Sequence, residues 1–219
     1  MRGGVDKTLF IKKFNSGIIS AQIYLVDIVF GSTSQAKVDE FVNQMKKEFE
    51  MSMVGELNYF LGFQIKQVDN GIFISQGKYA QNLVKNFGLS QSQHMRNPMG
   101  TNDKLTKDEC GMSVDLSLYR SMIGSILYLT ASGPDICYSV GVCARYQANP
   151  KESHVTVVKR IIRYVSETVD YGIWYSNDTN GRLAGFSGAD WAGSTDDRKS
   201  ITGGCFYLGN NLVSWYSKK

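Results

Sequence analysis

The sequence has no apolar run approaching the roughly 20 residues that cross a bilayer, and its first residues lack the apolar core of a signal peptide. We therefore expect a cytoplasmic or nuclear protein without a membrane partner. Only two histidines and four cysteines occur, without a Cys-x-x-Cys pair or a histidine at zinc spacing from a cysteine. This pattern argues against a zinc site and predicts free thiols in a reducing compartment.

Proline is also scarce, with three residues, and no Gly/Ser-rich tract occurs. Hydrophobic residues make up 42% and charged residues 20%, which is typical of a packed globular protein. The net charge of +4 is compatible with a phosphate-backbone partner, although many unrelated proteins share such a charge. The chain enters a strand pattern almost at once and stops directly after an apolar stretch, so we expect a piece cut from a longer protein.

Hydrophobic spacing predicts an α+β fold, in which strands alternate with helices and then follow them. The predicted strands before the helical region are 7–13, 18–24, 28–30, 57–65 and 72–74. The predicted helices are 35–49, 77–87, 116–131, 135–147 and 151–167, with a polar linker at 90–114. From residue 171 the period returns to two, which predicts one antiparallel meander of strands 171–175, 183–187, 203–208 and 212–216.

The segment 22–33 resembles the active-site hairpin of copia-class LTR retrotransposon reverse transcriptases, which carries Tyr-Val-Asp-Asp at its turn. Tyr24 matches the tyrosine, Asp27 matches the second aspartate, and Val26 stands where the first aspartate is expected. The resemblance implies Mg²⁺ as cofactor, because such a turn holds two metal ions together with a third carboxylate from an upstream strand. Valine has no lone pair for a hard cation, so we expect Asp27 to be a residual, weak ligand or an ordinary turn residue.

The resemblance continues beyond this hairpin. Residues 49–62 resemble the segment leading into the primer-grip strands, which implies that Phe60, Leu61 and Gly62 lie near a primer terminus; the alternative is a strand glycine at a bulge. Residues 71–80 resemble the entry to the thumb, and Lys78 with Tyr24 completes the implied nucleic-acid contacts.

Later segments resemble the connecting helices and the first ribonuclease H strand of the same family. In the connecting region, Gly133 occupies the position of a usual arginine. Residues 184–193 resemble the ribonuclease H strand, with Gly188 where the first metal-binding aspartate is expected. Asp190 lies two residues on, on the same strand face, and is a weak substitute as a metal ligand. The remaining acids of that site would follow Lys219.

The resemblance covers almost the whole chain and implies four parts. These are a partial polymerase palm at 1–75, a thumb-like helix and linker at 76–114, a helical connection at 115–170 and a truncated ribonuclease H-like domain at 171–219. We expect an inactive fragment of an RNA-directed DNA polymerase. The alternatives are a non-catalytic remnant that grips an RNA/DNA template–primer duplex, and half of an enzyme completed by other parts of the polyprotein. Uncovered strand edges also predict poor solubility.

Overall fold

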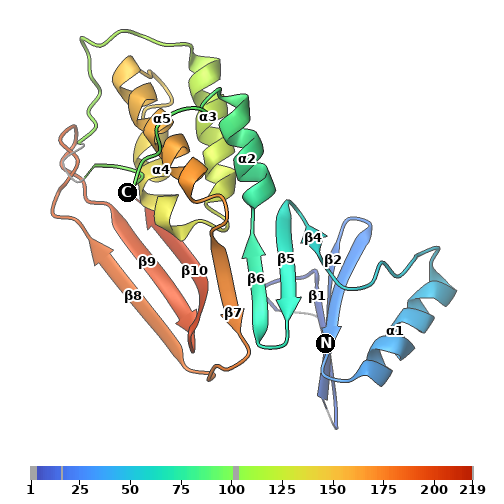
Figure 1. The fold of residues 1–219 in the computed structure, drawn as a ribbon. Helices are drawn as coiled ribbons and strands as arrows, with labels where there is room; N and C mark the ends of the chain where they lie inside the picture. The colour runs from blue at the N-terminus through green and yellow to red at the C-terminus, as the bar shows by residue number, and fades with distance from the viewer. Residues whose placement is uncertain (1–3, 16, 101–103, 219) are drawn as a thin grey trace. The chain divides into compact units, whose positions relative to one another are not determined.

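The computed structural model describes residues 4–15, 17–100 and 104–218. The chain forms two compact units, Met1–Leu57 and Asn58–Lys219, and Figure 1 traces both from the blue N-terminus to the red C-terminus. Helices and antiparallel sheets occur in each, so the predicted α+β class is confirmed. No helix in the described part of the chain is long and apolar enough to cross a membrane.

The first unit is a three-stranded antiparallel sheet with one helix. Its strands β1 (Leu9–Phe14), β2 (Gly17–Tyr24) and β3 (Asp27–Ser32) lie in that order. Helix α1 (Gln35–Glu48) contacts β3, and the ring of its Phe41 lies 4.9 Å from that of Phe30. Among residues 4–15 and 17–57 no side chain is fully buried, since one helix over three strands encloses very little apolar surface.

The second unit holds the hydrophobic core between four helices. These are α2 (Gly77–Asn86), α3 (Leu116–Leu129), α4 (Cys137–Ala144) and α5 (Glu152–Glu167), which stand side by side in Figure 1. Fully buried Tyr119 and Ile123 of α3 and Ile161 and Ile162 of α5 form the centre of this core. Burying each such aliphatic side chain contributes about 1.5–3 kcal/mol.

The ends of these helices are fixed by specific caps. The Asp115 carboxylate accepts hydrogen bonds from the backbone N–H groups of Ser117 (2.7 Å) and Leu118 (3.0 Å) at the start of α3. At the start of α5, His154 Nδ1 accepts the backbone N–H of Lys151 at 2.9 Å. The fully buried His154 ring therefore completes a helix terminus, and its Nε2 lies 2.7 Å from the carbonyl oxygen of Thr106.

Two sheets complete the second unit. One runs β4-β5-β6-β7, with strands Tyr59–Phe60, Phe63–Val68, Gly71–Ser75 and Gly172–Ser176, and the other runs β10-β9-β8, with strands Asn211–Lys218, Thr202–Leu208 and Leu183–Ala189. All neighbouring strands are antiparallel. The Asn211 side chain joins β7 to β10, since it accepts from Ser176 N at 2.8 Å and donates to Ser176 O at 3.1 Å.

Three sequence-based predictions of elements need correction. The strand predicted at 57–65 is a hairpin of β4 and β5, because Leu61 (φ 50°) and Gly62 (φ 83°) turn the backbone. The helix predicted at 135–147 begins as a 3-10 turn, Pro134–Ile136, and its α-helical part ends at Ala144. There the backbone tightens to i→i+3 hydrogen bonds, as from the Tyr146 N–H to the Cys143 carbonyl.

The third correction concerns the predicted four-strand meander. Strand β7 pairs with β6 in a register that runs from Gly71↔Ser176 to Ser75↔Gly172, so only β8, β9 and β10 form the meander. Strand β6 pairs with β5 along one edge and with β7 along the other. The pairing with β7 buries Ile173 opposite Ile74. Residues 71–75 and 172–176 therefore share one sheet, although the family-based division into four parts places them in different parts; that division stays a prediction.

Candidate functional site

The hairpin that resembles a polymerase active site ends in a two-residue loop. Tyr24 pairs with Asp27 across the last rung of the β2–β3 ladder, and Leu25 and Val26 form the loop between them. Both loop side chains are 85% exposed. Leu25 has φ 54°, a left-handed conformation that usually belongs to glycine or asparagine. The predicted position of the hairpin tip is confirmed.

The side chains at this tip do not fit a pair of magnesium ions. Asp27 is exposed at the first position of β3 and offers one carboxylate, whereas Val26 offers only methyl groups. Within the ranges 4–15, 17–100 and 104–218, no three His, Cys, Asp or Glu side chains are grouped closely enough to hold a metal ion. Mg²⁺ prefers carboxylate and other oxygen ligands in near-octahedral geometry, and one carboxylate supplies too few.

The segment predicted to be a primer grip forms the β4–β5 turn. The carbonyl oxygen of Leu61 accepts a hydrogen bond from the Tyr128 hydroxyl of α3 at 2.5 Å. A Cβ atom at Gly62 would lie 2.0 Å from that same hydroxyl oxygen. The positive φ and the Tyr128 hydroxyl therefore both favour glycine here, and this preference exists without any bound primer.

The same surface includes the start of α2. The Tyr79 and Tyr128 rings contact edge to face at 4.8 Å, and Lys78 is exposed one residue before Tyr79. The backbone N–H of Lys78 donates to Gln64 Oε1 at 2.7 Å, which attaches the helix start to β5. The structure thus brings the predicted contacts Phe60–Gly62 and Lys78 to one region of the second unit, whereas Tyr24 lies in the first unit.

Strand β8 is the strand that resembles the ribonuclease H domain, and Asp190, the weak metal ligand predicted on it, lies directly after its end. Gly188 of β8 pairs with Gly203, and a Cβ added there would have no atom within 4 Å, so a larger side chain would fit. Asp190, half-buried just after β8, accepts the Ile201 backbone N–H on Oδ1 at 2.6 Å. Its carboxylate closes the loop between β8 and β9.

A hydrogen-bonded group around Tyr146 was not predicted from the sequence. The Tyr146 hydroxyl lies 2.8 Å from the Leu105 carbonyl oxygen and 3.1 Å from Asp196 Oδ2, while Asp196 Oδ1 accepts the Lys107 N–H at 3.1 Å. Burial and the neighbouring Asp196 carboxylate raise the pKa of Tyr146 to about 12, and its ring stacks on His154 at 4.2 Å. No local sequence pattern signals this group, because its members lie up to 91 positions apart.

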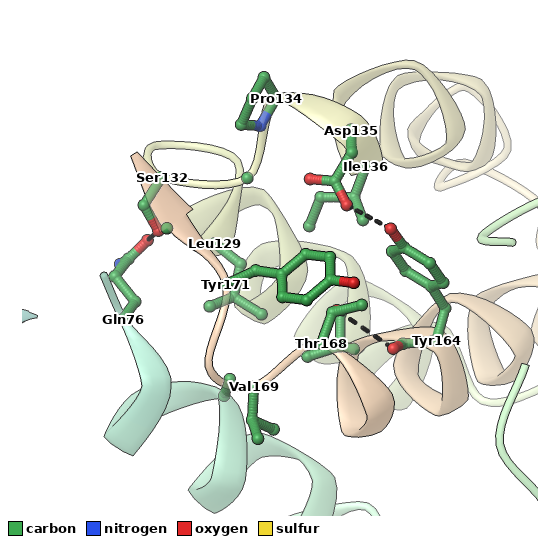
Figure 2. Close-up of a pocket in the computed structure, with 14 residues that line it drawn as sticks. Gln76, Leu129, Ser132, Pro134, Asp135, Ile136, Tyr164, Thr168, Val169 and Tyr171 are labelled. Atoms are coloured by element: carbon green, nitrogen blue, oxygen red, sulfur yellow. Dashed lines mark hydrogen bonds between the residues drawn. The ribbon is translucent and has the colours of Figure 1, made fainter. Parts of the chain in front are cut away.

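A cavity of about 280 Å³ lies where α2, the turn at Pro134–Ile136 and the end of α5 meet. In Figure 2 the Tyr171 ring reaches over it, and the Tyr164 hydroxyl donates to Asp135 Oδ2 at 2.6 Å. Burial and the Asp135 carboxylate raise the pKa of Tyr164 above its usual range. Gly133, at the usual arginine position of the resemblance, lines this cavity without a side chain.

Buried Gln76 borders the same cavity through an amide that is only half satisfied. Its Oε1 accepts from the Ser132 hydroxyl at 2.8 Å, while Nε2 finds no partner among the described residues. Because solvent does not reach Nε2, a molecule in the cavity would not contact it without a side-chain rearrangement.

Comparison with known proteins establishes the class. Residues 2–101 match the family model described as reverse transcriptase (RNA-dependent DNA polymerase). The chain is 32% identical to the retrovirus-related Pol polyprotein from transposon RE2 of Arabidopsis thaliana over 98% of its own length. It is 31% identical to the polyprotein from transposon RE1 of the same plant, also over 98% of its length.

A shorter relative matches over most of both chains. This uncharacterized mitochondrial protein of Arabidopsis thaliana is 33% identical over 90% of the present chain and 82% of its own length. Residues 2–101 therefore belong to the reverse-transcriptase family, and the chain is homologous over nearly its whole length to the Pol polyproteins of copia-type transposons. It spans 15% of the length of each of the RE1 and RE2 polyproteins, and no solved structure matches it.

Proposed function

We propose that the chain is a fragment of a copia-type reverse transcriptase and ribonuclease H that catalyses neither DNA synthesis nor RNA cleavage. The observation that carries the proposal is the hairpin tip, where an exposed valine stands beside Asp27. Two-metal polymerisation needs carboxylates that hold two ions about 3.5–4 Å apart. Val26 contributes no ligand atom to such a pair.

The ribonuclease H-like assignment of the last three strands belongs to the same proposal. The antiparallel order β10-β9-β8 and the resemblance of residues 184–193 support it. The expected ligand position is Gly188, and the nearby Asp190 carboxylate already accepts a backbone hydrogen bond. A nuclease site would therefore lack its first ligand for the same chemical reason as the polymerase hairpin.

Primer extension tests the proposal directly. The purified chain, incubated with labelled primer–template, deoxynucleotides and Mg²⁺ or Mn²⁺, is expected to add no nucleotide. The variant Val26→Asp restores a carboxylate at the family position. Leu25→Asp is its matched control, since it places a carboxylate in the same turn but one residue away from that position. Metal-dependent extension by the unmodified chain alone would contradict the proposal.

Completion by another chain is tested by the same variants. If the missing part of the polyprotein restores activity, Val26→Asp mixed with an upstream polymerase fragment extends the primer and Leu25→Asp does not. Absence of extension from Val26→Asp in that mixture rules out the two-chain enzyme.

Duplex binding without catalysis is a second candidate function. The observation in its favour is that Lys78 and the half-exposed Leu61 lie on one surface of the second unit. Backbone recognition predicts affinity for an RNA/DNA duplex that falls steeply with salt and shows no base preference. A filter-binding titration unaffected by raising the salt would exclude this role.

A further inference from the structure

A short segment before α3 is attached to the second unit by bonds from several parts of the chain. We call residues 105–108 the strap; they belong to no helix or strand. The Leu105 carbonyl oxygen accepts the Tyr146 hydroxyl at 2.8 Å, and the Thr106 carbonyl oxygen lies 2.7 Å from His154 Nε2. Two carbonyl groups of the strap are therefore held by side chains that lie 41 and 48 positions further along the chain.

The next two residues of the strap have partners on other elements. The Lys107 backbone N–H donates to Asp196 Oδ1 at 3.1 Å, and the Asp108 carboxylate accepts the Ser153 hydroxyl at 2.6 Å. The strap thus connects the chain after α4, the start of α5 and the loop between β8 and β9. Of the side chains that hold it, the His154 ring is the most deeply buried, with no exposed surface.

The two hydrogen bonds of His154 fix its protonation state. A backbone N–H can only donate, so the 2.9 Å bond from Lys151 N makes Nδ1 the acceptor and leaves it without a hydrogen. A carbonyl oxygen can only accept, so Nε2 carries the hydrogen in the bond to Thr106. The arrangement therefore requires a neutral imidazole with its hydrogen on Nε2, and this one ring joins the start of α5 to the strap.

The rings packed around His154 provide no counter-charge for a second proton. Tyr146 stacks on it at 4.2 Å, and Tyr119 of α3 meets it edge to face at 6.4 Å. Burial raises the pKa of Tyr146 to about 12 and the pKa of Tyr119 well above its usual range. Both phenols are therefore neutral wherever histidine side chains ordinarily titrate, between pH 5 and 8.

The charged groups near the ring do not compensate an imidazolium either. Lys151 is buried at the same helix end, and its ammonium donates to the Ser113 hydroxyl at 3.1 Å, so it adds a charge of the same sign. The Asp108 and Asp196 carboxylates accept hydrogen bonds from other groups, and no carboxylate in the described part of the chain forms an ion pair with His154. The remaining charged side chains on the strap, on α3 and its cap, directly after α4 and in the first turn of α5 are exposed or half-exposed: Lys107, Asp115, Arg120, Arg145 and Glu152.

We propose that His154 is a pH-dependent latch, in which uptake of a proton on Nδ1 breaks the cap of α5 and releases the strap. A hydrogen on Nδ1 would face the Lys151 N–H donor against donor, and the imidazolium would be a buried charge without a partner. The ring must then leave its site or admit water, and either movement breaks its bond to Thr106. The proposal does not rest on the proposed function, since it uses only contacts within the second unit.

Amide hydrogen exchange of the full chain, followed by mass spectrometry at pH 7.5 and pH 5.0, tests the proposal. Labelling times are scaled to the intrinsic exchange rate at each pH. Protection of residues 105–108 and of Lys151 should fall about tenfold or more at pH 5.0, because one coupled proton shifts an opening equilibrium by up to tenfold per pH unit. Residues 119–126 in the middle of α3 should keep their protection. Equal protection of the strap at the two pH values would overturn the proposal.

The two histidines of the chain, His94 and His154, provide a matched pair of variants. His154→Gln keeps an amide donor for the Thr106 carbonyl but cannot take up a proton in this range, so strap protection should no longer depend on pH. His94→Gln removes an exposed histidine, and the pH dependence should remain. A dependence that persists in His154→Gln, or disappears in His94→Gln, would assign the effect to another group and contradict the latch.

Nitrogen NMR of histidine-labelled chain tests the protonation state without altering His154. In the His94→Gln background the one remaining histidine should show a hydrogen on Nε2 and a bare Nδ1 at pH 7.5. At pH 5.0 the imidazolium signal should appear together with the loss of strap protection. A hydrogen on Nδ1 at pH 7.5, or an imidazolium at pH 5.0 beside a fully protected strap, would refute the mechanism even if His154→Gln failed to fold.

Discussion

The β4–β5 turn provides the sharpest test of how this chain is stabilised. Gly62→Ala forces alanine into φ 83° and places its Cβ where the Tyr128 hydroxyl now lies. The left-handed backbone costs roughly 1–2 kcal/mol for a non-glycine residue. Displacing Tyr128 also removes its hydrogen bond to Leu61, worth about 0.5–1.5 kcal/mol. The two effects predict a loss of roughly 1.5–3.5 kcal/mol.

Tryptophan fluorescence is the appropriate measurement, because Trp174, Trp191 and Trp215 all belong to the second unit. For a unit of this size, about 2–4 °C of melting temperature corresponds to 1 kcal/mol. Gly62→Ala should therefore lower the melting temperature by roughly 3–14 °C. Tyr128→Phe removes only the hydrogen bond and should cost about 0.5–1.5 kcal/mol.

The double variant separates the two contributions. The bond between Tyr128 and Leu61 can be lost only once, so Gly62→Ala combined with Tyr128→Phe should cost less than the sum of the single changes. Strict additivity would show that alanine leaves the Tyr128 bond intact. An unchanged melting temperature for Gly62→Ala would refute the structural role of this glycine and leave close approach by a primer as the reason for it.

Three further measurements test other parts of the second unit. Asn211→Ala removes both bonds to Ser176 and should cost about 1–3 kcal/mol, whereas an unchanged melting temperature would show that β7 and β10 do not need this link. The pKa of Tyr146 is raised to about 12 by burial and Asp196, so its neutral form stabilises the fold; this contribution to stability should be constant below pH 10 and should be lost as the pH rises from 10 to 12. Tyr146→Phe should reduce the loss of stability between pH 10 and 12. An identical pH profile for the variant would count against the contact between Tyr146 and Asp196. Burial raises the pKa of the Cys143 thiol to about 12, so iodoacetamide at pH 8 should label exposed Cys110 and spare Cys143 until the chain unfolds; equally fast labelling would contradict the buried site.

Local sequence patterns predict most of the elements but not how distant strands pair. The helical spacing of residues 116–131 and 151–167 was sufficient to locate both helices, because the residues that each helix buries recur at that spacing. The turn at Leu61 was missed because a leucine at positive φ has no signature in sequence, and Gly62 alone also fits a bulge. Strand β7 was assigned to the wrong sheet, since alternation of side chains shows that a strand exists but not which edge it joins.

In the candidate site, too, local features could be predicted from the sequence, whereas contacts between distant residues could not. The hairpin tip was located correctly because a two-residue loop between apolar strands is a local feature. The roles of Asp190 and Asp196 were not foreseen, because each carboxylate is bound by groups that are distant in sequence or across a loop. The resemblance predicts at which positions a family ligand is absent, whereas only the structure shows what Asp190 and Asp196 contact.

The pairing of β6 with β7 also has a consequence for synthesis on the ribosome. Residues 71–75 leave the exit tunnel about 100 positions before their partner, residues 172–176. Translation proceeds at about 5–20 residues per second, so one edge of β6 stays unpaired for roughly 5–20 s. During this interval the nascent polypeptide is most exposed to chaperones and to misassembly with its neighbours.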